Sequence, residues 1–467
     1  MGLKNRALWA PIFYPACAVW LAKTCARNGC YGCPPAVCRC VSGSLPVEFL
    51  ASACALTAYV VNLYEFFLRG VVMPDSIIDV NDTKQMELYI HVPFCTRKCF
   101  YCDFLSFPVH ETEHQAYVDQ LVREITFGSA MAQRHEISSI FIGGGTPSLL
   151  DPKHIVRILD TVRANYAVRK DAEITIEVNP ASTIQYKLKA YRAAGINRLS
   201  IGLQSANDQE LKTLGRIHIF DDFLKCFQSA RMEGFQNINI DLMNDIPGQT
   251  VRSWKDTLRH VLMLKPEHLS IYNLIIEDGT PFKKMLSDGA LSLPNEGVQM
   301  MIDFETKSAM EKYGYHRYEV SNYAKPGFEC RHNYGYWSNV PYLGFGLGAS
   351  SYLEHTRWSV IRDYQAFLDL DLEADARNGY PQLFTDVEKL TRNDEMAEFM
   401  FLGLRRTAGI SEIEFTSRFQ VDIHSVYGPV LDRYTAEGLL IHEGYRYRFS
   451  DHGFDVSNQV LSDFILD

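Results

Sequence analysis

The stretch HVPFCTRKCFYCDF, His91 to Phe104, gathers three cysteines in the order C-x3-C-x2-C. These are Cys95, Cys99 and Cys102, and Phe104 stands two positions after the last of them, where a fourth cysteine could extend the pattern. A structural zinc site closes around four ligands, a catalytic thiol needs one cysteine beside a base, and thiolates hold iron–sulfur clusters. A cubane with three local thiolates would leave one iron open to a small molecule. The spacing alone leaves both zinc and an iron–sulfur cluster open.

The composition is that of a globular protein of 467 residues, 47% hydrophobic and 22% charged. This length accommodates two to three domains at about 150 residues each. The net charge of −10 argues against a broad grip on nucleic acid, which needs clustered basic residues. Most of the twelve cysteines precede residue 55, unlike the even distribution of a short disulfide scaffold. We therefore expect the main body to be cytoplasmic and reduced.

Residues 1–85 form a Cys-rich, hydrophobic extension with three open interpretations. Its uncharged runs, Ala7 to Ala22 and Phe49 to Tyr64, are shorter than the roughly 20 apolar residues of a spanning helix. The extension could be an over-extended start, a membrane-associated segment or a small metal knuckle, and MELYIHVPF from Met86 resembles a natural chain start. The knuckle would bind zinc through the cysteines of CYGCPPAVCRC, which are Cys30, Cys33, Cys38 and Cys40.

From Glu87 onward, short β-branched runs alternate with amphipathic stretches, which is the pattern of βαβ units and a parallel sheet. The predicted strands cover 87–91, 137–142, 173–178, 198–203, 237–242 and 268–275. Helices are predicted at 114–128, 153–166 and 253–264. Six units favour an incomplete (β/α)6 barrel over a closed eight-fold one, although a doubly wound open sheet has the same rhythm.

Polar or glycine-rich residues follow or end five consecutive predicted strands. They are Cys95, GGGTPS (143–148), Glu177, Gln204 and Asp241. In βα barrels the chemistry gathers at the C-terminal ends of the strands. We therefore expect these residues to form one site in a core barrel over residues 86–300.

The rhythm breaks after residue 280. Residues 301–389 are predicted to be a loop-rich, aromatic segment, and residues 390–467 a small, mostly helical, winged-helix-like domain. For this last domain we favour packing or partner docking over nucleic-acid binding, because the chain is acidic.

The cysteine motif directly after a first strand, with Tyr101 before the last cysteine, resembles the radical S-adenosylmethionine (SAM) enzymes. The resemblance implies a [4Fe–4S] cluster held by Cys95, Cys99 and Cys102, with SAM on the open iron as the source of a 5′-deoxyadenosyl radical. The usual fold of that family is the incomplete barrel predicted above. Further motifs resemble one branch, the oxygen-independent coproporphyrinogen III oxidases and the HemW-type heme chaperones. These motifs are YIHVPFC, GGGTPSLL, TIEVNP, AGINRLSIGLQS, LGRIH, INIDLM, IPGQT, RYEVSNYAKPG, RHNYGYW and YLGFG.

The resemblance also implies a SAM site but no firmly assigned catalytic residue. Its members would be Tyr89, Gly144, Gly145, Thr146, Glu177, Gln204, Arg216 and Asp241. Glycines let the backbone approach a ligand, carboxylates accept its hydrogen bonds, and Arg216 would offer a planar fork to a carboxylate.

Two features separate the two kinds of relative. The oxidases have a fourth cysteine where this chain has Phe104, whereas C-x3-C-x2-C-x-F resembles the HemW pattern. HNYGYW, His332 to Trp337, matches a motif proposed for heme binding, and His332 is the candidate heme ligand, since histidine is a natural axial ligand of heme iron. The resemblance therefore implies a chaperone that hands heme to acceptors such as respiratory cytochromes. The alternatives are the oxidase, which decarboxylates coproporphyrinogen III to protoporphyrinogen IX, and a zinc-binding scaffold.

Some partners stay open at this point. We expect no nucleic-acid partner, whereas a homodimer and membrane association, through heme acceptors or the extension, are left open. The chain also departs from the usual pattern at Asn244 and Asp245, where an aromatic residue and glycine are common, and at Leu347 and Ser350, where proline and histidine are common.

Overall fold

The computed structural model describes residues 85–466. The predictions for the hydrophobic runs and the cysteine group before Met86 therefore lie outside the described residues. Within residues 85–466, no helix is long and apolar enough to cross a membrane.

Six parallel strands form the core in chain order. They are β1 (Gln85–Val92), β2 (Glu136–Gly144), β3 (Ala167–Val178), β4 (Arg198–Gln204), β5 (Ile238–Asn244) and β6 (His268–Asn273). Alternating Ile, Leu and Val side chains place one face of each strand in a common core, as β-propensity and burial predict. The six strands of the predicted incomplete barrel are confirmed.

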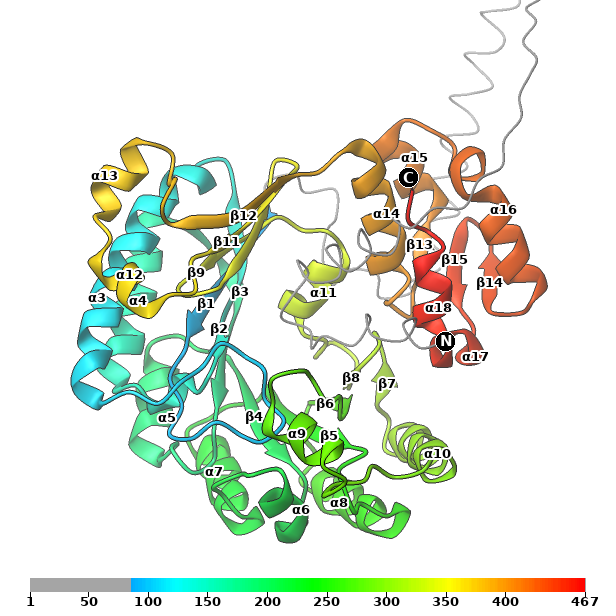
Figure 1. Ribbon diagram of the computed structural model, residues 1–467, viewed down its shortest axis with the longest axis horizontal. Coiled ribbons are helices and arrows are strands. Elements are labelled where there is room, and N and C mark those ends of the chain that lie inside the picture. Colours follow the sequence, from blue (N-terminus) through cyan, green and yellow to red (C-terminus); the bar gives the residue numbers. More distant parts are fainter. Residues whose placement is uncertain (1–84, 467) are drawn as a thin grey trace, which may run out of the picture.

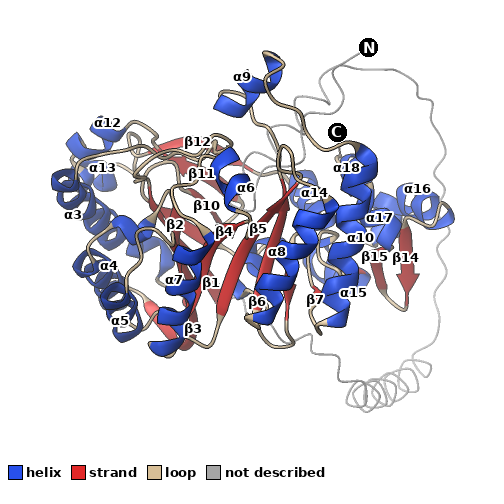
Figure 2. Ribbon diagram, turned by 90° about the horizontal axis from the view of Figure 1, so that it is seen from below, coloured by secondary structure: helices blue, strands red, loops and turns tan. Residues whose placement is uncertain are grey.

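Helices cover the outer face of this sheet (Figure 2). They are α3 (Glu111–Gly128), α4 (Pro152–Asn165), α5 (Gln185–Ala193), α6 (Asp208–Thr213), α7 (Phe220–Met232) and α8 (Val251–Met263). Local sequence fixes several starts. Asp151 accepts a hydrogen bond from the Lys153 amide at the start of α4, and Thr250 caps α8 in the same way through Ser253, which satisfies amides that the helix leaves free.

The segment predicted to be loop-rich holds more regular structure than its sequence indicates. Its strands β7 (His316–Arg317) and β8 (Asn322–Ala324) extend one edge of the sheet, and β9 (Tyr342–Phe345), β10 (Ser350–Leu353), β11 (Thr356–Val360) and β12 (Phe384–Lys389) extend the other. With two to six residues each, these strands are too short for a clear period-2 pattern. The other elements that precede the C-terminal domain are the short helices η1 (Ser129–Ala132) and η2 (Pro147–Leu149) of the barrel, and the helices α9 (Pro281–Ser287), α10 (Glu296–Lys312), α11 (Arg331–Trp337), α12 (Tyr364–Asp369) and α13 (Leu372–Arg377).

The C-terminal domain has its own hydrophobic core and lies beside the barrel (Figure 1). It comprises α14 (Arg392–Gly403), β13 (Ile410–Ser411), α15 (Glu412–Phe419), α16 (Ile423–Ala436), β14 (Leu440–Glu443), β15 (Arg446–Phe449), α17 (Asp451–Asp455) and α18 (Ser457–Ser462). Its antiparallel sheet has the order β13-β15-β14, which fits the predicted winged-helix-like order. The short helix α11 contacts both β2 and α14, so it links barrel and domain.

Candidate functional site

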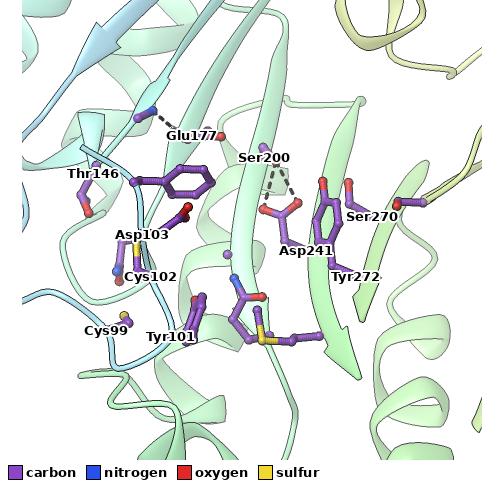
Figure 3. Close-up of a pocket in the computed structure, with 18 of the residues that line it drawn as sticks. Cys99, Tyr101, Cys102, Asp103, Thr146, Glu177, Ser200, Asp241, Ser270 and Tyr272 are labelled. Carbon is purple, nitrogen blue, oxygen red and sulfur yellow. Dashed lines mark hydrogen bonds between the residues drawn. The ribbon is translucent and has the colours of Figure 1, made fainter. Parts of the chain in front are cut away.

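A cavity of about 250 Å³ lies inside the partial barrel. The cysteine loop forms one wall, strands β3 to β6 form another, and residues of α11 and the C-terminal domain also line the cavity. Figure 3 shows Cys102 and Thr146 on one side of this space and Asp241, Ser270 and Tyr272 on the other. The predicted polar strand ends therefore do meet around one cavity.

All three cysteines of the opening motif line the cavity as free, partly exposed thiols. The Sγ of Cys95 lies 3.6 Å from the Thr146 hydroxyl, and the Arg216 guanidinium lies 3.8 Å from the Sγ of Cys99. Burial raises the pKa of Cys95 and raises that of Cys102 to about 12. A thiolate here therefore needs a compensating positive charge, such as a bound metal centre, to form at neutral pH.

The glycine turn after β2 brings backbone to the cavity wall and leaves no room for side chains. Gly144 has φ +116°, and a Cβ there would meet the His91 ring at 2.6 Å. A Cβ on Gly145 would lie 2.6 Å from the Phe94 carbonyl oxygen. The Gly144 amide donates to Glu177 Oε2 at 3.0 Å, and burial, helped by the nearby Asp241 carboxylate, raises the pKa of Glu177 to about 8.

Strands β4 and β5 supply the opposite wall. The Ser200 hydroxyl donates to both oxygens of Asp241, at 3.1 and 3.3 Å, and Asn239 Nδ2 donates to Asp241 Oδ1 at 2.7 Å. Burial raises the pKa of Asp241 although these hydrogen bonds oppose the shift. Glu177 and Asp241 thus place carboxyl oxygens at the cavity wall.

Two predicted site residues, Tyr89 and His332, do not line this cavity. The Tyr89 hydroxyl is hydrogen-bonded to His91 Nδ1 at 3.0 Å, and Tyr89 lines a small neighbouring pocket together with Phe104 and Gly144. The other seven residues of the predicted SAM site do line the cavity, namely Gly144, Gly145, Thr146, Glu177, Gln204, Arg216 and Asp241.

His332 lies in the protein interior, with its side chain fully buried. Its Nδ1 is 2.8 Å from the Ser139 hydroxyl and its Nε2 is 3.0 Å from the Tyr336 hydroxyl, while its ring stacks on Phe141. Burial lowers the pKa of His332 to about 3. The ring is therefore neutral, with both nitrogens engaged, and this arrangement does not present a nitrogen to a ligand. From the same motif, Asn333 and Trp337 do line the cavity.

Substituting His332→Ala is expected to lower the free energy of unfolding by about 2–4 kcal/mol, because it leaves a cavity and two unpaired hydroxyls. Urea denaturation of the apo protein measures this loss, with His452→Ala on the exposed surface of α17 as the matched control. Unchanged stability together with lost heme binding would contradict this structural role and favour the predicted ligand role.

Several cavity residues escaped the sequence-based predictions. Alternate residues of β4 line the cavity, namely Arg198, Ser200, Gly202 and Gln204. Because alternate side chains of a strand point to the same face, the predicted position of Gln204 in RLSIGLQ also indicates Arg198 and Ser200. Arg405 also lines the cavity, but it belongs to the C-terminal domain. No local pattern could have indicated it.

The departures from the usual pattern are accommodated locally. Asp245 adopts φ 59°, the left-handed conformation that aspartate tolerates at a cost. The Ser350 hydroxyl lies 3.1 Å from that of Ser359, and Leu347 is fully buried in the core. The backbone course is therefore kept, whereas a histidine at position 350 would have offered different chemistry.

Two family models and several curated proteins match this chain. The Radical SAM superfamily model matches residues 89–261, and the HemN C-terminal domain model matches residues 390–456. The heme chaperone HemW of Bacillus subtilis is 35% identical over 378 residues, covering 81% of this chain and 98% of the relative. The chain belongs to the HemW family of radical SAM proteins.

Other relatives agree with this membership. The heme chaperone HemW of Escherichia coli is 34% identical, covering 82% of this chain and 98% of the relative. A zebrafish protein, the mitochondrial radical S-adenosyl methionine domain-containing protein 1, is 31% identical over 82% of this chain and 87% of its own length. The solved coproporphyrinogen III oxidase of E. coli has a TM-score of 0.71 at 22% identity, covering 85% of this chain and 94% of that one. This last likeness concerns the fold.

The radical SAM family implies a [4Fe–4S] cluster and SAM, and the residues present fit both. Within residues 85–466, no group of three or more His, Cys, Asp and Glu side chains surrounds a single ion position, whereas a mononuclear zinc site needs every sulfur at about 2.3 Å. Cys95, Cys99 and Cys102 would hold the cluster through their thiolates, which lie along one loop at the cavity. When bound, the cluster and SAM would supply one-electron chemistry. The residues that would hold SAM are those of the glycine turn with Glu177, Asp241 and Arg216, which all line the cavity.

Proposed function

We propose that this protein is a heme chaperone, which binds heme in the cytoplasm and transfers it to acceptor proteins such as respiratory cytochromes. The observation that carries the proposal is the near-complete match to curated relatives named heme chaperones, two of which align over 98% of their own length. Phe104 supports it further, because this residue lines the cavity beside the cysteines and offers no ligand to iron.

The cavity walls suit a partly apolar ligand with a flat ring system. Trp337 and Tyr272 contribute aromatic surface, and aromatic rings pack well against a flat macrocycle. Ligation of the heme iron by His332 stays a prediction. It requires α11 to move, since both ring nitrogens of His332 are hydrogen-bonded.

Paired assays on one preparation test this function. The protein is reconstituted anaerobically with iron and sulfide, and one half is titrated with heme while the other receives SAM, a reductant and coproporphyrinogen III. We expect saturable heme binding, transfer of heme to an apo-cytochrome, and no protoporphyrinogen IX. Decarboxylation of coproporphyrinogen III without stable heme binding would replace the proposal with the oxidase function.

A further inference from the structure

The basic side chains of the cavity fall into two groups. Those that line it are Arg97, Lys98, Arg198, Arg216 and Arg405. Three of them donate hydrogen bonds to backbone carbonyl oxygens at 2.6 to 2.9 Å. The buried Nε of Arg198 and the buried Nε of Arg405 have no hydrogen-bond partner among residues 85–466. Buried polar groups in native proteins are almost always paired, so the unpaired Nε atoms of Arg198 and Arg405 require an explanation.

Arg198 has charge compensation within the protein. Its side chain is almost fully buried, and the neighbouring Cys330 and Glu173, with Asp241 further along, raise its pKa although burial opposes them. Carboxylates therefore stabilise its charge without a ligand.

Arg405 lacks comparable compensation. Burial lowers the pKa of Arg405 to about 10, and the only opposing group among the described residues is Glu319. Glu319 is itself pushed toward its neutral form, since burial raises its pKa to about 7. A buried cation with so little negative charge nearby destabilises the free protein and gains most from an incoming anion.

A purely structural role at the end of α14 does not account for Arg405. Cations near a helix C-terminus do stabilise its last carbonyls, but the neighbouring Arg406 performs that role. Arg406 donates to the Gly403 and Gly409 carbonyl oxygens at 3.4 and 3.1 Å and to the Ser338 hydroxyl at 3.0 Å. Arg405 instead lies over the Trp337 ring, with its Cζ 5.4 Å from the ring centroid, at the cavity wall.

We propose that Arg405 binds a carboxylate of the ligand that occupies the cavity, with Trp337 holding the guanidinium in place from beneath. Arginine offers parallel N–H groups that match the two oxygens of a carboxylate. The C-terminal domain thereby becomes part of the binding site. The inference rests on the proposed function in one respect: a heme chaperone would present a heme propionate here, whereas the other carboxylate source is SAM.

Binding of hemin and of its dimethyl ester tests this assignment on the reconstituted full chain. Arg405→Met is compared with the wild type, with Arg405→Lys, and with Arg418→Met, which removes an exposed arginine from the same domain. We expect Arg405→Met to weaken hemin binding roughly tenfold to hundredfold, the range for a hydrogen bond to a charged group. It should leave binding of the dimethyl ester unchanged, because the ester carries no carboxylate.

Three further results support the assignment. Arg405→Lys should recover part of the affinity, SAM binding should be unaffected, and apo Arg405→Met should be at least as resistant to urea as the wild type, since it loses an uncompensated buried cation. Equal losses for hemin and its ester would overturn it. A loss of SAM binding alone would identify SAM as the source of the carboxylate and overturn the assignment of Arg405 to a heme propionate. If the wild type binds no hemin at all, the proposed function fails first. If the wild type binds hemin and Arg405→Met binds it equally well, this inference fails alone.

Discussion

Replacing Cys99 with serine is expected to abolish cluster binding by the reconstituted protein. Cys99 lines the cavity on the same loop as Cys95 and Cys102, and each thiolate would hold a different iron. Serine is nearly isosteric but does not form a comparable soft ligand for iron. Iron and acid-labile sulfide per chain should therefore fall to near the level of the unreconstituted protein. Colorimetric iron and sulfide assays after anaerobic reconstitution measure the loss.

The matched control is Cys226→Ala, which removes a buried cysteine of α7 that does not line the cavity. This variant should keep the iron and sulfide content of the wild type. Zinc without iron or sulfide in the reconstituted wild type would contradict the cluster assignment and restore the zinc scaffold. Iron retained at wild-type levels in Cys99→Ser would show that this thiol is not a cluster ligand.

The core of the fold was predictable because local chemistry decides it. Runs such as EITIEV and NINIDL combine β-branched residues with the period of a strand, and they do form β3 and β5. The outer strands were not predictable in this way. β9 pairs in parallel with β1, with Leu343 opposite Leu88, across more than two hundred residues of sequence. Such pairing depends on the assembled sheet rather than on a four-residue sequence.

The site also contains residues that local sequence predicts and residues that only the packing of distant segments brings to the cavity. Glu177 and Asp241 were found because strand ends in a βα barrel converge. The role of His332 stays a prediction that its motif alone does not decide, because the orientation of its ring depends on how α11 packs against Phe141. Arg405 could not be predicted from its local sequence, because its place at the cavity depends on how the C-terminal domain packs against the barrel.

A buried ion pair joins β11 to α14 of the C-terminal domain, and breaking it is expected to give the largest loss of stability. Arg357 of β11 donates to both carboxylate oxygens of Glu398 on α14, at 2.6 and 3.0 Å, and their side chains are 5% and 2% exposed. Arg357→Met leaves the Glu398 carboxylate buried without its partner. We expect the free energy of unfolding, measured by urea denaturation, to fall by about 3–5 kcal/mol.

Replacing both charged residues distinguishes the effect of the charges on stability from the effect of the volume that the two side chains fill. The double variant Arg357→Met, Glu398→Met should recover most of the loss, since replacing a buried ion pair by apolar residues is often neutral. Lys255→Met breaks the half-exposed pair with Glu305 and should cost less than about 1 kcal/mol. A loss for Arg357→Met as small as that of Lys255→Met would show that the buried pair does not hold the domain.

The same variants connect stability to ligand binding. Glu398 lies in the middle of α14 and Arg405 lies just beyond its end, so we expect the ion pair to help position the Arg405 guanidinium at the cavity. Arg357→Met should therefore weaken hemin binding in the same sense as Arg405→Met, under conditions where the protein is still folded. The double variant should bind hemin nearly as the wild type does, because α14 is again held against β11. Recovery of stability without recovery of hemin binding would mean that the pair acts on the ligand by another route than the position of Arg405.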